Sequence, residues 1–318
     1  MRVPHLGLLF LLILTSCKQV TSYKQEVFPS AFPKVQIPTD NPFTKETVAL
    51  GKQLFFEKGL SKNGLLSCAS CHAPEKYFTD GLTLSQIGVS HQKLKRHSPT
   101  LINLAYATNG LFWDGGAKNL ESLVFAPLFH PDEMGNDTEG VEGFLRSNEH
   151  YANGIKRLYD TDEVKIQYAA KAIAQYVRSI VSYQAKYDSV MAGSAHFSEA
   201  EIKGYQLFQQ NCDACHTAPL FTDNEFHQGY ISINYENLEP DSPKLGRYRI
   251  TQDSTDLGKY KTPSLRNIEH TAPYMHDGAV ARLEVALEHS LELNELSKQE
   301  RQDLLAFLQT LNGPALVD

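Results

Sequence analysis

Apolar residues recur at helical spacing along much of this chain. Residues 163–191 are predicted to form one long helix, because apolar side chains lie there at successive turns: Ala169, Ala172, Ile173, Tyr176, Val177 and Ile180. A last helix, about residues 297–311, begins at a capping box of Ser297 and Glu300. Strand patterns are sparse, and the best one, residues 230–233, is short. The pattern therefore predicts a mainly α fold.

Two further helical segments match each other. Residues 50–55 read Leu-Gly-Lys-Gln-Leu-Phe and residues 203–208 read Lys-Gly-Tyr-Gln-Leu-Phe. The first helix is expected to begin near Thr44, and the second at a capping box of Ser198 and Glu201. A glycine inside a helix costs about 1 kcal/mol. Two glycines at matched positions therefore predict close packing against another helix.

The match between these two regions continues through further blocks in the same order. Four pairs of segments correspond: 68–72 with 212–216, 78–80 with 221–223, 99–104 with 263–268, and 113–121 with 276–284. Such ordered repetition indicates an internal duplication. We therefore predict two tandem domains of one fold, over residues 42–193 and 194–318.

The cysteines indicate what these domains bind. Four of the five cysteines lie in two copies of Cys-x-x-Cys-His: Cys68, Cys71 and His72, and Cys212, Cys215 and His216. This pattern is typical of c-type haem, in which both thiols bond to the porphyrin and the His can bind the iron. The alternatives are half a zinc site or a redox-active pair. Zinc ribbons place their pairs about 15–20 residues apart, and a redox pair has no need of the His twice. Two haem c groups are the prediction.

The N-terminus reads as an export signal. Arg2 precedes an apolar run over residues 6–14, which is too short to remain as a membrane span. Residues 14–17, Leu-Thr-Ser-Cys, resemble the lipobox of bacterial lipoproteins, which implies cleavage before Cys17 and its acylation. Residues 1–17 are therefore predicted to be a lipoprotein signal peptide, and the alternative is an ordinary signal peptide with an incidental cysteine. Residues 18–41 would form a tether, and the protein would be a membrane-anchored lipoprotein of the bacterial periplasm.

The balance of charged residues argues against one class of partner. The chain has 30 Lys and Arg against 37 Asp and Glu. This balance argues against a nucleic acid as partner. It is too weakly acidic to identify any other partner.

The blocks together are similar to those of the bacterial di-haem cytochrome c peroxidases, including the MauG type. The resemblance covers about residues 41–313 and rests on residues 68–72, 78–81, 98–101, 112–115, 133–135, 262–267 and 271–278. It implies a peroxidatic haem in the N-terminal domain and an electron-transfer haem in the C-terminal one. It also implies reduction of hydrogen peroxide with electrons from a small cytochrome c or a cupredoxin. Homodimers are frequent in the family.

The resemblance assigns roles to two residues of the N-terminal domain. Glu133, in Pro-Asp-Glu-Met-Gly, matches the distal glutamate, which moves a proton between the peroxide oxygens. The alternative is that Glu133 is a solvent-exposed loop carboxylate without a catalytic role. Trp113, the only tryptophan, matches the residue between the two haems, and we expect it to mediate electron transfer. It would also serve as a core aromatic.

The chain departs from the family near the first haem. Some members carry a distal His that must leave before peroxide binds, and Val89 stands at that position. We therefore expect a first haem that is open without reductive activation. His91, two residues away, could be an iron ligand, a distal acid–base group or a solvated loop residue. Leu123 replaces a frequent glutamine and makes the distal pocket less polar.

The second iron lacks an obvious sixth ligand. The family's Met or Tyr falls here on Ser290, a poor ligand. Met275 and His289 are the two candidates, and the sequence does not choose between them. Met ligation would raise the haem potential, as an electron store requires.

An inter-domain calcium ion is the other expected cofactor. Thr271 and Pro273 match residues whose carbonyls bind it in the family, but His97 replaces the asparagine that completes the site. Imidazole suits calcium less well than oxygen does.

Two other functions compete with peroxide reduction. A MauG-type oxidase would modify a protein side chain, although Ser290 does not supply the tyrosine ligand that marks this type. A non-enzymatic di-haem electron carrier would normally have a sixth ligand on both irons. Glu133 in its motif and the lack of an obvious sixth ligand at the first iron argue against such a carrier.

Overall fold

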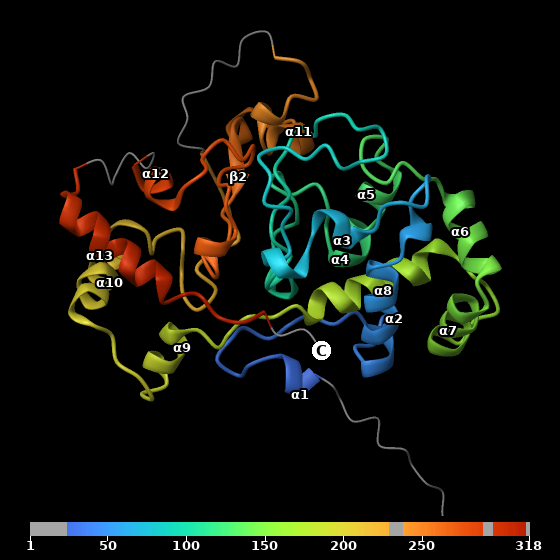
Figure 1. The fold of residues 1–318 in the computed structure, drawn as a ribbon, viewed down its shortest axis with the longest axis horizontal. Helices are drawn as coiled ribbons and strands as arrows, with labels where there is room; N and C mark the ends of the chain where they lie inside the picture. The colour runs from blue at the N-terminus through green and yellow to red at the C-terminus, as the bar shows by residue number, and fades with distance from the viewer. Residues whose placement is uncertain (1–23, 229–237, 289–294, 316–318) are drawn as a thin grey trace, which may run out of the picture.

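The helices of this chain gather into two groups that lie side by side (Figure 1). The computed structural model describes residues 24–228, 238–288 and 295–315. The first group holds α1 Lys24–Val27, α2 Lys45–Phe55, α3 Cys68–Cys71, α4 Leu120–Leu123, α5 Phe125–Phe129, α6 Thr138–Ser147, α7 Glu149–Tyr159 and α8 Ile166–Ser179. The second holds α9 Lys186–Met191, α10 Glu199–Asn211, α11 Tyr248–Thr251, α12 Leu283–Glu288 and α13 Lys298–Gln309.

Strands and short helical turns complete the described elements. Strands β1 Phe226–Gln228 and β2 Lys259–Lys261 pair antiparallel, with His227 opposite Tyr260. The 3₁₀ turns are Lys58–Leu60, Pro74–Lys76, Leu104–Tyr106, Pro243–Leu245, Ser254–Asp256 and Ile268–His270. The predicted mainly α fold of two tandem domains is confirmed. The predicted strand at 230–233 lies outside the described residues.

Each group is built on one close pair of crossing helices. Helix α2 packs on α8, and α10 packs on α13. A Cβ at Gly51 would overlap the carbonyl oxygen of Ala172, and a Cβ at Gly204 would overlap that of Asp303. The close packing predicted from the two matched glycines is therefore confirmed, and the duplication extends to the helix crossing itself.

The long helix predicted over 163–191 is wrong, because the chain leaves the helix between α8 and α9. The segment between them is held by two asparagines at equivalent places in the repeat. Asn103 donates to the Ser182 carbonyl at 3.1 Å and accepts from the Ser182 N–H at 3.0 Å. Asn267 donates to the Ser182 hydroxyl at 2.9 Å. These bonds from distant residues outweigh the local helical pattern, and α9 packs through Tyr187 on the second core.

The two halves meet through reciprocal contacts. The His97 N–H donates to the His276 carbonyl at 3.0 Å, and the Lys261 N–H donates to the Trp113 carbonyl at 2.9 Å. Positions 97 and 261, like 113 and 276, correspond in the duplicated sequence. The halves therefore face each other as the two subunits of a symmetric dimer would.

The N-terminal segment crosses both halves. Phe32 and Val35 are buried in one cluster with Tyr106 of the first half and Leu220 of the second. The Arg266 guanidinium lies 4.5 Å from the Phe32 ring centroid. Residues 24–41, which the sequence suggested as part of a tether, thus form a strap on the folded body, because their apolar side chains find partners there. Cys17 lies outside the described residues.

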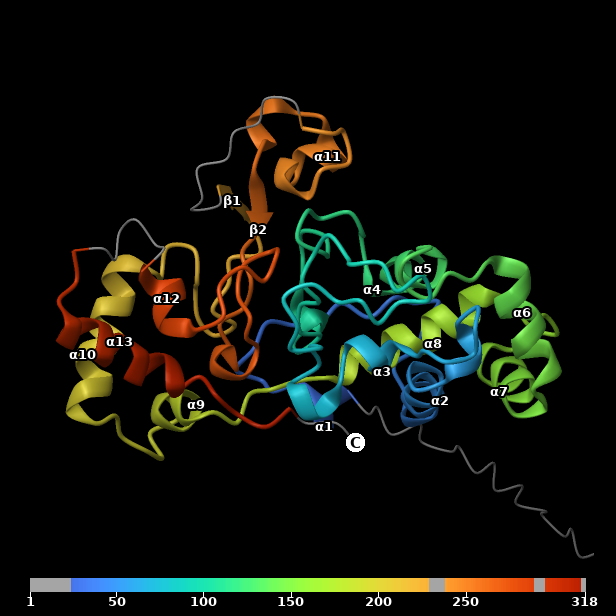
Figure 2. The ribbon, with the colours of Figure 1, turned by 45° about the horizontal axis from the view of Figure 1, so that its top comes forward.

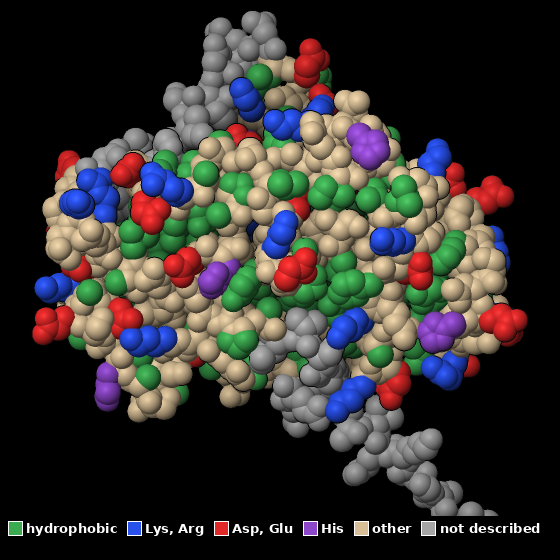
Figure 3. Space-filling view, in the orientation of Figure 1, with side chains coloured by type: hydrophobic (Ala, Val, Ile, Leu, Met, Phe, Trp, Pro, Cys, Tyr) green, Lys and Arg blue, Asp and Glu red, His purple; other side chains and the backbone are tan. Residues whose placement is uncertain are grey.

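A small lobe rises from the second half. It contains β1, β2 and α11 and stands above the junction of the halves (Figure 2). Arg249 of this lobe forms an ion pair with Asp114 of the first half at 3.1 Å. Charged side chains of both signs are interspersed over the face in Figure 3. Within the described residues, none of the helices has the length and apolar character needed to cross a bilayer.

Candidate haem sites

The first Cys-x-x-Cys-His motif forms the short helix α3 and the residue after it. Ser67 precedes the helix, and its N–H donates to the Ser70 hydroxyl at 3.0 Å, which fixes where the helix begins. His72 then leaves the helix, and its Nδ1 donates to the Phe78 carbonyl at 3.0 Å. That bond assigns the proton to Nδ1 and leaves Nε2 as the nitrogen that can bind a metal.

The second motif repeats this arrangement. The Nδ1 of His216 donates to the Phe221 carbonyl at 3.1 Å. Burial lowers the pKa of both His72 and His216, which favours the neutral form of the two imidazoles. A neutral imidazole with an oriented ring is the form that an iron ligand requires. The geometry of both histidines is compatible with the predicted role of proximal ligand, which stays a prediction.

The first two cysteines do not resemble a redox-active pair. Burial raises the pKa of the Cys68 thiol to about 12 and that of the Cys71 thiol to about 11. Redox-active cysteines instead have a lowered pKa, because their reactivity needs the thiolate. This chemistry argues against the thioredoxin-like alternative and suits thiols destined for thioether bonds.

A cavity of about 210 Å³ opens beside His72. Its walls are mostly apolar, and Cys68 and His72 lie among them. The first half supplies further walls from Leu101, Leu104, Leu123, Val124, Pro127, Ile173 and Val177. The fit to a c-type haem is good: Cys68 and Cys71 would hold its edge, His72 would bind its iron, and the apolar walls would cover its rings.

Glu133 lines the same cavity. Its side chain is 33% exposed, and burial raises the pKa of its carboxyl above the ordinary value. His130 lies 3.8 Å from the Glu133 carboxylate and opposes this rise. His130 was not predicted from the sequence, although its place three residues before Glu133 was a usable signal.

The loop around Val89 positions Glu133. The Val89 N–H donates to the Glu133 carbonyl at 2.8 Å, and the Ser90 hydroxyl donates to Asp132 at 2.8 Å. A Cβ at Gly88 would overlap the Asp132 carbonyl, so only glycine permits this approach. The segment that contains Val89 is thus folded back as a support for the Glu133 loop.

The other predicted residues of the first half lie at different distances from this cavity. Trp113 lines it and donates from Nε1 to the His97 carbonyl at 3.3 Å, at the junction of the halves. Leu123 also lines it, as a less polar pocket requires. His91 is exposed in its loop and is not among the cavity's described walls.

The second half places one of its two candidate ligands. Met275 packs, half-buried, against the second core, while His289 and Ser290 lie outside the described residues. The choice between Met275 and His289 stays open. His276, the residue after Met275, stacks its ring on that of Tyr260, with the two ring centroids 4.1 Å apart.

The structure places His97 and Thr271, two of the residues expected near calcium, but the calcium site itself stays a prediction. The Nδ1 of His97 donates to the Leu82 carbonyl at 2.9 Å. The Thr271 hydroxyl donates to the Ile268 carbonyl at 3.3 Å.

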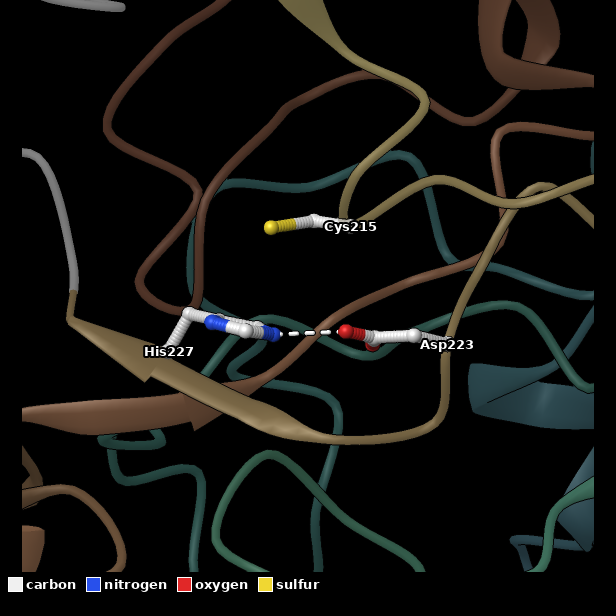
Figure 4. Close-up of side chains that lie close together, drawn as sticks. All are labelled: Cys215, Asp223 and His227. Carbon is white, nitrogen blue, oxygen red and sulfur yellow. Dashed lines mark hydrogen bonds and ion pairs between the residues drawn. The ribbon is translucent and has the colours of Figure 1, made fainter.

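One cluster could suggest a different metal. Cys215, Asp223 and His227 point toward one another, with the His227 Nε2 2.6 Å from the Asp223 carboxylate (Figure 4). Cys215, however, belongs to the second haem motif. A thioether bond would consume its sulfur, so the cluster and a haem at this motif exclude each other as uses of that residue.

Comparisons with known proteins agree with this geometry. The family model described as di-haem cytochrome c peroxidase matches residues 45–196, and the cytochrome c model matches residues 201–312. Methylamine utilization protein MauG of Methylorubrum extorquens is 37% identical over 88% of this chain and 82% of its own length. Cytochrome c551 peroxidase of Nitrosomonas europaea is 36% identical over 86% of this chain and 81% of its own.

A solved structure extends the likeness to three dimensions. The crystal structure of a MauG-like protein associated with microbial copper homeostasis superposes with a TM-score of 0.83 and 31% identity, covering 92% of this chain and 96% of that one. The chain therefore belongs to the family of di-haem cytochrome c peroxidases and MauG proteins, which implies two haem c groups, and its two Cys-x-x-Cys-His motifs are the residues that would hold them.

Proposed function

We propose that this protein reduces hydrogen peroxide to water with electrons from a small redox protein, a cytochrome c or a cupredoxin. One observation carries the proposal: Glu133 and His72 line the same cavity. A proton-transferring carboxyl and a proximal iron ligand in one apolar pocket are what cleavage of an O–O bond requires.

The reaction consumes one peroxide, two protons and two electrons and yields two waters. The haem irons, when present, would supply the site of bond cleavage and the electrons. Glu133 would take the proton from one peroxide oxygen and deliver it to the departing one. Its raised pKa, caused by burial, suits this exchange because an acid–base group works best with a pKa near the working pH.

Trp113 would help electrons pass between the halves. Its side chain lines the first cavity, and its carbonyl accepts from the N–H of Lys261 in the second half. A change to phenylalanine keeps an aromatic ring and removes the indole N–H. If Trp113→Phe leaves the inter-haem electron-transfer rate unchanged, Trp113 has no such role.

A second candidate is MauG-type oxidation of a protein side chain. The 37% identity to a MauG protein favours it. In that case an oxidised state formed with peroxide would persist in the presence of small electron donors.

Stopped-flow mixing of peroxide with the half-reduced holoprotein separates these functions. Rapid turnover in the presence of a reduced small cytochrome c or a cupredoxin supports peroxide reduction. A long-lived oxidised species that such donors do not reduce supports the MauG-type reaction. Absence of any reaction with peroxide would leave a plain electron carrier and would contradict both proposals.

A further inference from the structure

The cavity beside His72 has a single cationic side chain among its described walls, and the second half supplies it. That residue is Lys261 on β2, and Glu133 is the corresponding single carboxylate. All other described walls except His72 are apolar or uncharged. The first haem site is thus an apolar cavity that belongs mainly to one half and receives its positive charge from the other.

The Lys261 ammonium has donors to spare. Its Nζ donates to the Asn224 carbonyl at 2.9 Å, and it lies 5.4 Å from the Phe226 ring centroid. An ammonium carries three donors. Among the described residues, no carboxylate pairs with it within ion-pair distance, although Asp223 and Glu225 are near enough to act through space.

The backbone fixes where this side chain begins. The Lys261 N–H donates to the Trp113 carbonyl at 2.9 Å, and β2 pairs with β1. The side chain therefore starts at the junction of the halves, beside the residue expected to lie between the haems. A lysine serving only to bond the Asn224 carbonyl would have no need of a place in this cavity.

Burial without a paired anion is unfavourable for Lys261. Desolvation lowers the pKa of its ammonium to about 8, and the carboxylates nearby offset this only in part. An anion inside the cavity would pair with the ammonium and offset the free-energy cost of burying it. Haem matches the cavity in this respect, because it is an apolar macrocycle with two carboxylates on one edge.

We propose that Lys261 binds a carboxylate of the first-domain haem and so joins that haem to the second half. The proposal rests on the haem sites of the family and is independent of peroxide reduction. The bond would orient the carboxylate edge toward the junction. It would also compensate the carboxylate's negative charge, so the reduced haem is favoured more than it would be without the lysine.

The test is a redox titration of the holoprotein that resolves both haems optically. We expect Lys261→Met and Lys261→Gln to shift the potential of the first-domain haem to more negative values. Lys261→Arg keeps the charge and should restore the wild-type potential. Having two neutral variants keeps the test valid if one of them fails to fold.

Lys259→Met provides the matched control. Lys259 stands on the same strand, is 33% exposed and pairs with Asp256 at 3.5 Å. Its removal should leave both potentials unchanged. An unshifted first haem in both neutral variants would overturn the proposal, as would an equal shift in Lys259→Met or a shift confined to the second haem. None of these outcomes involves peroxide, so they are separate from a failure of the proposed reaction.

Discussion

The two halves of this protein share their scaffold and differ in what is built upon it. Both cross two helices at a glycine, Gly51 or Gly204. Both orient the proximal imidazole through a backbone carbonyl, that of Phe78 or Phe221. These features fix a haem ligand in either half. The features that the two halves share are thus those that would hold a haem, and they involve few residues.

The segments that lie between the matched blocks occur at different points in the two halves. In the first half, the chain between α4 and α8 forms α5, α6, α7 and the loop with Glu133. In the second half, the chain between Asp223 and Pro263 forms β1, β2 and α11, which stand over the junction. One of these segments supplies the carboxyl group of Glu133 to a cavity, and the other supplies contacts across the junction. The two halves therefore differ through the segments that lie between the blocks of sequence they share.

Removing the carboxylate that only the first half possesses should have the largest effect. Glu133→Gln keeps the shape and abolishes proton exchange, so kcat/KM for peroxide should fall about 10²–10⁴-fold. Steady-state kinetics with a reduced small cytochrome c measure this. Glu139→Gln on the exposed face of α6 is the control. Wild-type rates for Glu133→Gln would remove the functional distinction between the halves.

Adding a methyl group at the shared helix crossing tests the scaffold. Gly51→Ala and Gly204→Ala should each lower the free energy of unfolding by about 1–3 kcal/mol, since each Cβ meets a backbone carbonyl. Gly143, inside α6, has open space around it, so Gly143→Ala should stabilise the protein by up to about 1 kcal/mol. Denaturant titration followed by circular dichroism compares the three. Tolerance at only one crossing would show that the halves are packed differently.

Ser182 tests how the halves share the segment between α8 and α9. Ser182→Ala removes the bond from Asn267 of the second half and leaves the backbone bonds to Asn103 of the first. The free energy of unfolding should fall by about 1 kcal/mol, because a buried donor loses its partner. Ser147→Ala at the exposed end of α6 should change it by less than about 0.5 kcal/mol. Equal effects would deny Ser182 a joining role.

The smallest effect concerns the pH profile of the first site. Burial raises the pKa of Glu133 and His130 lowers it. The proton-accepting carboxylate is lost as the pH falls through that pKa. His130→Gln should therefore raise the pKa and move the acidic limb of the kcat/KM profile to higher pH. His150→Gln, exposed on α7, should leave the limb in place. A limb that moves to lower pH would contradict the assigned charge relation.

Features with local causes could be predicted from the sequence. The helix starts at Thr44, Ser198 and Ser297 follow from side chains that bond their own first turn, and the structure confirms all three. The haem motifs are likewise local. Glu133 was singled out through its motif, and the structure places it on the wall of the cavity beside His72.

Features with distant causes could not be predicted. The break after α8 depends on Asn103 and Asn267, which approach the chain only in the folded state. Lys261 reaches the first cavity because the halves face each other reciprocally, and no pattern near Lys261 announces this. The apolar side chains of the strap, such as Phe32, read as loop residues until the junction that covers them exists.

That strap also bears on how the protein is made. A chain that emerges N-terminus first presents Phe32 and Val35 long before Leu220 and Arg266 are synthesised. Until then Phe32 and Val35 lack their partners from the second half. The strap is thus synthesised before its partners in either half, and both haem motifs are translated before Leu220 and Arg266 are available to complete its contacts.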